Sequence, residues 1–165
     1  MKYYVVADVH GFCSILKDSL REKGFFNDEE PHKLIICGDL FDRGGEAVEL
    51  QNFILELLKK DDVILIKGNH EELLVDMLNS WHRASYLESH HNSNGTVDTV
   101  LQLTGSRLAD LYDNPSDVYY KMKETPFMQK ILPAMVDYFE TENHIFVHGW
   151  IPCESIRHNP YAVTY

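Results

Sequence analysis

The sequence predicts an α/β fold built on a parallel sheet, and three observations support this prediction. Short, strongly apolar runs at Tyr3–Ala7, Leu34–Cys37 and Val63–Ile66 have the length and composition of buried strands. Segments with helical periodicity separate these runs, so strand and helix alternate along the chain. A polar motif follows each run directly, at the sheet edge where open α/β folds bind their ligands. The alternation implies right-handed crossovers between parallel strands.

The helices of this pattern are predicted from apolar spacing. Phe12–Lys23 has apolar residues at helical intervals, and Gly24 marks its expected end. Glu46–Lys60 is predicted as the second helix, with two lysines at its C-terminus, where the helix dipole favours positive charge. A third helix is expected from His70 to about residue 80. The apolar residues expected to face inward on the second helix are Val48, Phe53, Ile54, Leu57 and Leu58.

Residues 81–125 are more polar, and we expect them to form a helical insertion that covers the site. Short helices are predicted at Thr96–Leu103 and Asp117–Lys123, with turn signals between them. The pair His90 and His91 lies in a polar stretch and is expected to be solvent-exposed rather than metal-bound.

The last part of the chain is predicted to contain a hairpin. Ala134–Glu140 and His144–Val147 have strand character around a polar turn. No regular element is predicted for Ile151–Tyr165. We expect residues 1–165 to form one domain, since this length gives room for a sizeable core.

Composition limits the function further. A formal net charge of −11 argues against a general nucleic-acid binder, because phosphate backbones require a positive face. No apolar run is long enough to span a membrane. The three cysteines are scattered, so neither a disulfide framework nor a structural zinc site is expected. With no signal-peptide pattern before the first strand, the expectation is a reduced, cytoplasmic protein, and the oligomeric state stays open.

Three motifs carry the predicted chemistry: Asp8–Gly11 (Asp-Val-His-Gly), Gly38–Gly44 (Gly-Asp-Leu-Phe-Asp-Arg-Gly) and Gly68–Glu71 (Gly-Asn-His-Glu). Their carboxylate, imidazole and amide groups are ligands suited to a pair of divalent cations. At average composition, the five fixed letters of the second motif have a chance of roughly one in a million per start position. The combination therefore indicates a dinuclear metal site at the sheet edge.

The local geometry of these motifs leaves alternatives open. Strand alternation would place Asp8 and His10 on one side and turn Val9 into the protein. Asp8 or Asp39 could instead cap the helix that follows it. Arg43 could form a salt bridge with Asp42 or Glu46 rather than bind substrate.

The motifs resemble those of the phosphoprotein phosphatase (serine/threonine phosphatase) family, and most closely its small bacterial and phage-lambda branch. His144–Gly149 resembles the family's strand that ends in a metal-binding histidine, so the resemblance covers residues 1–71 and about 134–152. It implies a calcineurin-like metallophosphoesterase α/β sandwich and a metal-dependent phosphatase. The implied cofactors are two divalent metal ions, manganese first, with iron or zinc as alternatives.

The resemblance also implies a ligand set. Asp39 would bridge both metals, with Asp8 and His10 on the first metal and Asn69 and His148 on the second. In the family, a hydroxide held by the two metals attacks phosphorus in line with the leaving oxygen, without a phospho-enzyme.

Three further residues receive catalytic roles from the same resemblance. His70 would be the general acid that protonates the leaving alkoxide, and Asp42 would orient it. Arg43 would bind two phosphate oxygens through its planar guanidinium.

The family has one more histidine on the second metal, and here only His158, near the end of the chain, is a candidate. The C-terminal half of the sandwich is therefore expected to be incomplete, which would leave apolar surface exposed or covered by another chain.

The resemblance leaves three functions to weigh. The leading one is a phosphomonoesterase whose substrate is a phosphoserine or phosphothreonine protein, or a small phosphoester. The alternative is a symmetrical diadenosine tetraphosphate hydrolase, which shares the same motifs. A non-catalytic module that binds metal and phosphate is a third reading, against which the presence of both His70 and Asp42 argues.

Overall fold

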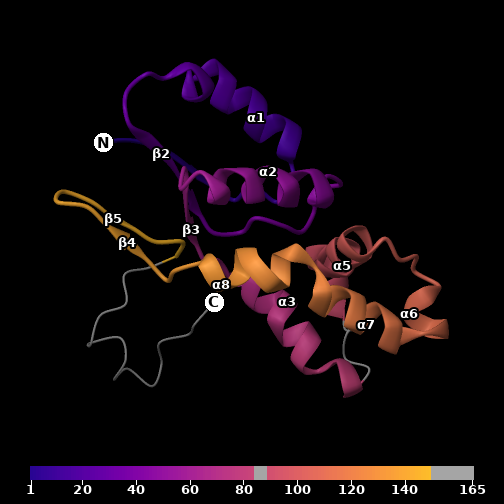
Figure 1. Ribbon diagram of the computed structural model, residues 1–165. Coiled ribbons are helices and arrows are strands. Elements are labelled where there is room, and N and C mark those ends of the chain that lie inside the picture. Colours follow the sequence, from indigo (N-terminus) through magenta and orange to yellow (C-terminus); the bar gives the residue numbers. More distant parts are fainter. Residues whose placement is uncertain (84–88, 150–165) are drawn as a thin grey trace, which may run out of the picture.

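The centre of the protein is a parallel sheet of three strands in the order β1-β2-β3 (Figure 1). The structure, a computed structural model, describes residues 1–83 and 89–149. The strands are β1 (Lys2–Ala7), β2 (His32–Cys37) and β3 (Val63–Ile66), in agreement with the prediction. Their ladders are in parallel register, with Val5 opposite Ile35 and Ile35 opposite Ile64. All three strands therefore end at the same edge of the sheet.

The connecting helices also agree with the predicted alternation. They are α1 (Cys13–Glu22), α2 (Ala47–Lys59) and, after β3, α3 (Asn69–Asn79). A short 3₁₀ turn, η1 (Phe25–Asn27), follows α1. None of the helices in the described ranges is long and apolar enough to cross a membrane.

One face of the sheet carries the main core. Leu34 and Ile36 of β2 belong to the same buried cluster as Leu16 of α1 and Ile54 of α2. On α2 the prediction was wrong for Val48, which is 39% exposed. The buried stripe of this helix instead runs through Ala47, Leu50, Gln51, Ile54 and Leu57, a spacing of three and four residues that turns Val48 to solvent.

The opposite face carries a smaller cluster. Ile35, Cys37 and Ile66 are buried there, with Tyr3, Ile64, Phe139 and Phe146 packed against them. The two phenylalanines come from the predicted hairpin, whose strands β4 (Phe139–Glu140) and β5 (Ile145–Phe146) are antiparallel and shorter than expected. Val5, on this face of the edge strand β1, is 48% exposed. This layer is therefore thin where it is described.

The insertion packs into the main core. The predicted helices correspond to α5 (Thr96–Thr104) and α7 (Pro115–Glu124). Sequence reasoning missed η2 (Trp81–Arg83), α4 (Ser89–Asn94), α6 (Asp110–Asp113), the π-helical turn η4 (Phe127–Ile131) and α8 (Leu132–Ala134). Four of these are a single turn long, and α4, with the sequence Ser-His-His-Asn-Ser-Asn, has no apolar period to reveal it.

Val97 and Val100 of α5 belong to the same buried cluster as the sheet residues. Figure 1 shows α5, α6 and α7 grouped beyond the end of α2, next to α3. The insertion is thus built onto the core that carries the sheet, and α5 reaches the edge where the strands end.

Candidate metal centre

The loops that follow β1, β2 and β3 converge on the carboxylate of Asp39. Two groups of potential ligands meet there, and within each group the ligand atoms lie within 4.8 Å of one another. One group is Asp8, Asp39 and His148, and the other is His10, Asp39 and His70. Asp39 is common to both groups, although it is only 3% exposed.

The two oxygens of Asp39 face different partners. Its Oδ1 lies 3.3 Å from Nε2 of His148, whereas its Oδ2 lies 3.7 Å from Nε2 of His10 and 3.8 Å from Nε2 of His70. Because one carboxylate oxygen points into each group, the geometry suits a carboxylate shared by two cations.

The tautomers of His10 and His148 also fit metal binding. Nδ1 of His10 lies 3.0 Å from the carbonyl oxygen of Phe41, and Nδ1 of His148 lies 2.9 Å from that of Cys37. A carbonyl can only accept, so each Nδ1–H donates and the lone pair of a neutral imidazole stands on Nε2. Metal-binding histidines are typically oriented by such a bond.

Asn69 completes a set of acceptors around His148. Its Oδ1 lies 2.9 Å from Nε2 of His148, which in turn lies 3.3 Å from Oδ1 of Asp39. With the imidazole neutral, these three atoms are all acceptors, and none has a proton to share with the others. An electrophile, either a proton or a cation, is what stabilises three converging lone pairs. The donor set of oxygen and imidazole nitrogen suits manganese, iron or zinc.

The backbone of the site is locally strained. Asp8, His10, Asp39, Asp42 and Arg43 all have positive φ, between 49° and 72°. In the part of the chain that the structure describes, Asp61 is the only other non-glycine residue with positive φ. Left-handed conformations of such residues cluster at functional sites, where the surrounding structure compensates for their cost.

This strain corrects the geometric argument for the first motif. Strand β1 ends at Ala7, and both Asp8 and His10 adopt the left-handed conformation, so strand alternation does not place them. Val9 is buried as predicted, but His10 is buried too, while Asp8 is exposed. The loop is held by its neighbour, because the backbone N–H of His10 donates to the carbonyl of Asp39 at 2.9 Å.

Glu71, which sequence reasoning did not assign to the site, ties two of its loops together. Its carboxylate accepts from the backbone N–H groups of Gly68 (2.7 Å), Leu40 (2.9 Å) and Asp39 (3.1 Å). Burial raises the pKa of the Glu71 carboxyl, and the three backbone donors act in the opposite direction. The sequence signal that could have identified Glu71 was its place in the first turn of α3, where a glutamate can cap the helix.

Gly68 explains how close these loops approach. A Cβ atom at this position would clash with the side chain of Asp39. The backbone N–H of the next-but-one residue, His70, donates to Oδ1 of Asp39 at 3.1 Å. The turn after β3 must therefore pack directly against the shared carboxylate.

His70 differs from the other two histidines in its Nδ1 partner. Its Nδ1 lies 2.8 Å from Oδ2 of Asp42, a carboxylate that is 1% exposed. Its Nε2 faces the metal centre, 3.8 Å from Oδ2 of Asp39 and 3.5 Å from Nη2 of Arg43. Glu46, the alternative partner considered for Arg43, accepts hydrogen bonds from Ser14 instead.

Other predicted features lie away from this centre. His158 is outside the described residues. Asp76, His90 and His91 form a third group of potential ligands, in which His90 is exposed as predicted but His91 is 1% exposed. The side chain of Asp76 is 68% exposed, so this group is at the surface.

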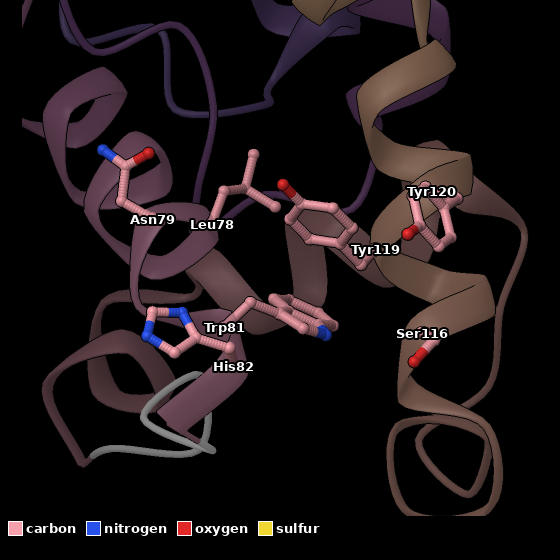
Figure 2. Close-up of a pocket in the computed structure, with 7 residues that line it drawn as sticks. All are labelled: Leu78, Asn79, Trp81, His82, Ser116, Tyr119 and Tyr120. Carbon is pink, nitrogen blue, oxygen red and sulfur yellow. The ribbon is translucent and has the colours of Figure 1, made fainter.

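A pocket of about 360 Å³ also lies apart from the metal centre, between the end of α3 and α7 (Figure 2). None of the candidate ligands lines it. Trp81, in its wall, donates from Nε1 to the carbonyl of Pro115 at 3.1 Å and packs on Tyr119 with ring centroids 5.8 Å apart. These aromatic residues therefore join η2, which follows α3, to α7.

Replacing Glu71 with glutamine should destabilise the protein, because the amide nitrogen cannot accept from the backbone donors that the carboxylate serves. We expect a loss of about 1–3 kcal/mol in the free energy of unfolding, measured by chemical denaturation. Glu72→Gln is the matched control, since the neighbouring Glu72 is exposed on the same helix. Equal midpoints for the two variants would contradict the bracing role of Glu71.

Comparisons with known proteins agree with this geometry. A family model described as calcineurin-like phosphoesterase matches residues 1–163. Serine/threonine-protein phosphatase 1 of Salmonella typhimurium is 37% identical over 73 residues, 44% of this chain and 31% of that protein. A symmetrical bis(5'-nucleosyl)-tetraphosphatase of Buchnera aphidicola is 37% identical over 75 residues, 46% of this chain and 26% of its own length.

Serine/threonine-protein phosphatase 2 of Escherichia coli is similar as well, at 34% identity over 73 residues, 44% of this chain and 31% of that protein. The chain thus spans about a third or less of the length of these relatives in the aligned region. The family match, by contrast, extends over nearly the whole chain and includes all the residues that converge on Asp39. The chain belongs to the calcineurin-like phosphoesterase family.

Proposed function

We propose that this chain hydrolyses phosphoric monoesters with the help of two divalent metal ions, manganese first among the candidates, and that its substrates are phosphoserine or phosphothreonine proteins. Asp39 would be shared by both ions, with Asp8 and His10 on one and Asn69 and His148 on the other. This division differs from the two groups of the structure, in which Asp8 lies with His148 and His10 lies with His70. Bound there, the ions would supply Lewis acidity and would make a water molecule a stronger nucleophile for in-line attack on phosphorus.

The observation that carries the proposal is the difference in Nδ1 partners among the three histidines. His10 and His148 donate to backbone carbonyls, as ligands do, whereas His70 donates to the buried carboxylate of Asp42. A carboxylate that accepts from Nδ1 fixes the ring so that Nε2 faces the metal centre, where a proton donor would meet the leaving oxygen. A proton donor beside a ligand set is what hydrolysis requires and simple binding does not.

The reaction then assigns a task to each of these side chains. Nε2 of His70 gives its proton to the oxygen that leaves phosphorus, and Asp42 stabilises the positive ring before that transfer. Arg43, whose guanidinium already lies near Nε2 of His70, donates to the phosphate oxygens and draws the ester toward the acid. The phosphoryl group passes to water without a covalent enzyme intermediate.

A second role for His70 follows from the same geometry. A carboxylate–histidine pair also occurs behind metal ligands, and the Nε2 of His70 lies within the group formed with His10 and Asp39. His70 as a ligand and His70 as an acid predict different losses when the side chain is replaced.

The second candidate substrate is a dinucleoside tetraphosphate. The phosphatase of Salmonella typhimurium and the symmetrical tetraphosphatase of Buchnera aphidicola described above are each 37% identical to this chain over their aligned regions. Both reactions can use the same ligand set, so the metal ligands themselves do not separate them.

Asp39→Asn should abolish metal-dependent turnover, because an amide offers one neutral acceptor where two charged oxygens now face two ligand groups. With p-nitrophenyl phosphate and manganese, we expect a fall in kcat/KM on the order of a thousandfold. Manganese retained after desalting should fall in parallel. Asp117→Asn, in a surface pair with Lys121, is the control and should remain within about twofold of the wild type. Full activity of Asp39→Asn would refute the dinuclear site.

His70→Asn distinguishes the two roles of His70. As an acid, its loss should reduce kcat for phenyl phosphate by about 10²–10⁴-fold. The loss should be smaller for p-nitrophenyl phosphate, whose leaving group needs no proton, and manganese content should stay unchanged. Equal losses for both esters together with reduced manganese content would identify His70 as a ligand instead.

The substrate proposal is tested by parallel assays on a phosphothreonine peptide and diadenosine tetraphosphate under identical metal conditions. We expect the higher kcat/KM for the phosphopeptide, with Asp39→Asn inactive on it. A higher kcat/KM for diadenosine tetraphosphate would identify the tetraphosphate as the preferred substrate. The proposed role of the metal ions would be unaffected by that result.

A further inference from the structure

The carboxylate of Asp42 is held from two sides, and only one of these is His70. Oγ1 of Thr96 donates to Oδ2 of Asp42 at 2.7 Å, and Oγ1 of Thr99 donates to Oδ1 at 2.8 Å. Both threonines lie on α5, more than 50 residues further along the chain. Asp42 therefore receives three side-chain donors, two of them from the insertion.

Thr99 also fixes the backbone of Asp42. Its Oγ1 accepts from the backbone N–H of Asp42 at 3.0 Å while donating to the carboxylate. A hydroxyl has one proton to give and lone pairs to accept with, so both bonds can form together. This matters because Asp42 has a φ of 72°, in the left-handed region that is uncommon for residues other than glycine.

The whole contact lies out of water. Thr96 is 0% exposed, and Thr99 and Asp42 are each 1% exposed. Removing a hydroxyl would leave a buried carboxylate oxygen short of a donor, which is costly out of water. The orientation of Asp42 is thus determined by α5 as much as by His70.

Contacts on either side of the threonines fix α5 against the same loop. Gln102 accepts from the backbone N–H of Ala47 and donates to the carbonyl of Gly44, both at 3.0 Å. At the start of the helix, Gly95 approaches the backbone of Arg43 so closely that a Cβ atom would clash with it. The helix follows the loop from Arg43 to Ala47.

We propose that Thr96 and Thr99 are positioning residues for the general acid of the proposed reaction: they hold the Asp42 carboxylate in the orientation that meets Nδ1 of His70. The inference rests on the proposed function. It gives the insertion a task at the reacting centre, since these two threonines touch neither substrate nor ligand and act through Asp42.

The test compares isosteric variants on two esters. Thr96→Val and Thr99→Val keep the shape of the side chain and remove only the hydroxyl. We expect each to lower kcat for phenyl phosphate by about 10–100-fold, as removal of a supporting hydrogen bond typically does, with little change in KM. For p-nitrophenyl phosphate the loss should be within about threefold, because its departure depends little on an acid.

Controls separate positioning from general damage to the fold. Thr104→Val makes the same change on the same helix, where Oγ1 bonds only within the helix to Val100 and Leu101, and should leave both esters unaffected. Thr99→Ser retains the hydroxyl and should restore most of the phenyl phosphate activity. In an Asp42→Asn background, Thr99→Val should have no further effect on the leaving-group dependence.

A second readout does not depend on turnover. In the metal-free protein, nitrogen-15 NMR should show a protected Nδ1–H on His70 that is lost or broadened in Thr99→Val and retained in Thr104→Val and Thr99→Ser.

Equal losses on both esters, absence of rescue by Thr99→Ser, or an unchanged His70 signal would overturn the positioning role. A wild-type protein that hydrolyses neither ester would refute the proposed function, while the NMR comparison would still decide whether α5 positions the pair.

Discussion

The arrangement of this site depends on keeping one carboxylate, Asp39, almost completely buried among other acceptors. Such a group is costly unless donors or cations compensate it. Among the described contacts, the backbone N–H of His70 donates to Oδ1 of Asp39. The imidazoles of His10 and His148 present lone pairs on Nε2 rather than donors. The neighbouring loops are built to tolerate this, with Glu71 collecting the backbone donors of Gly68, Asp39 and Leu40 so that the turn packs against the carboxylate. The remaining electrostatic demand is one that divalent cations fulfil.

Under the proposed function, histidine serves two purposes in this site, and the hydrogen-bond partner of each Nδ1 decides which. A backbone carbonyl behind Nδ1 leaves a lone pair on Nε2, whereas a buried carboxylate behind Nδ1 favours a protonated ring. Composition and spacing place His10, His70 and His148 in similar motifs, each following a strand. Only the fold shows that Phe41 and Cys37 stand behind two of them and Asp42 behind the third.

Features that depend on residues close together in the sequence could be predicted, whereas features that depend on residues far apart in the sequence could not. The strands, α1, α2 and α3, and the convergence of Asp8, Asp39 and His70 were predictable, because each motif follows its strand directly and parallel strands end at one edge. The backbone path of the first motif, Asp8–Gly11, was not predictable, because residues in the left-handed conformation break the alternation of a strand. Glu71, Thr96 and Thr99 carry no periodic signal, and their partners depend on how loops and the insertion dock.

The insertion shows why that docking was hidden. On α5, Val97 and Val100 form an apolar pair spaced three apart, which predicts a helix packed on the core. Thr96 and Thr99 form a second pair with the same spacing, one residue earlier and hence about 100° around the helix. Taken alone, these threonines look like ordinary residues of a short helix with modest propensity. Their neighbours in the core turn them toward Asp42, so the packing that stabilises the insertion also supplies the hydroxyls that hold the carboxylate of Asp42. A change that weakened the packing of α5 should therefore disturb the orientation of Asp42 and His70 before it disturbs the candidate ligands around Asp39.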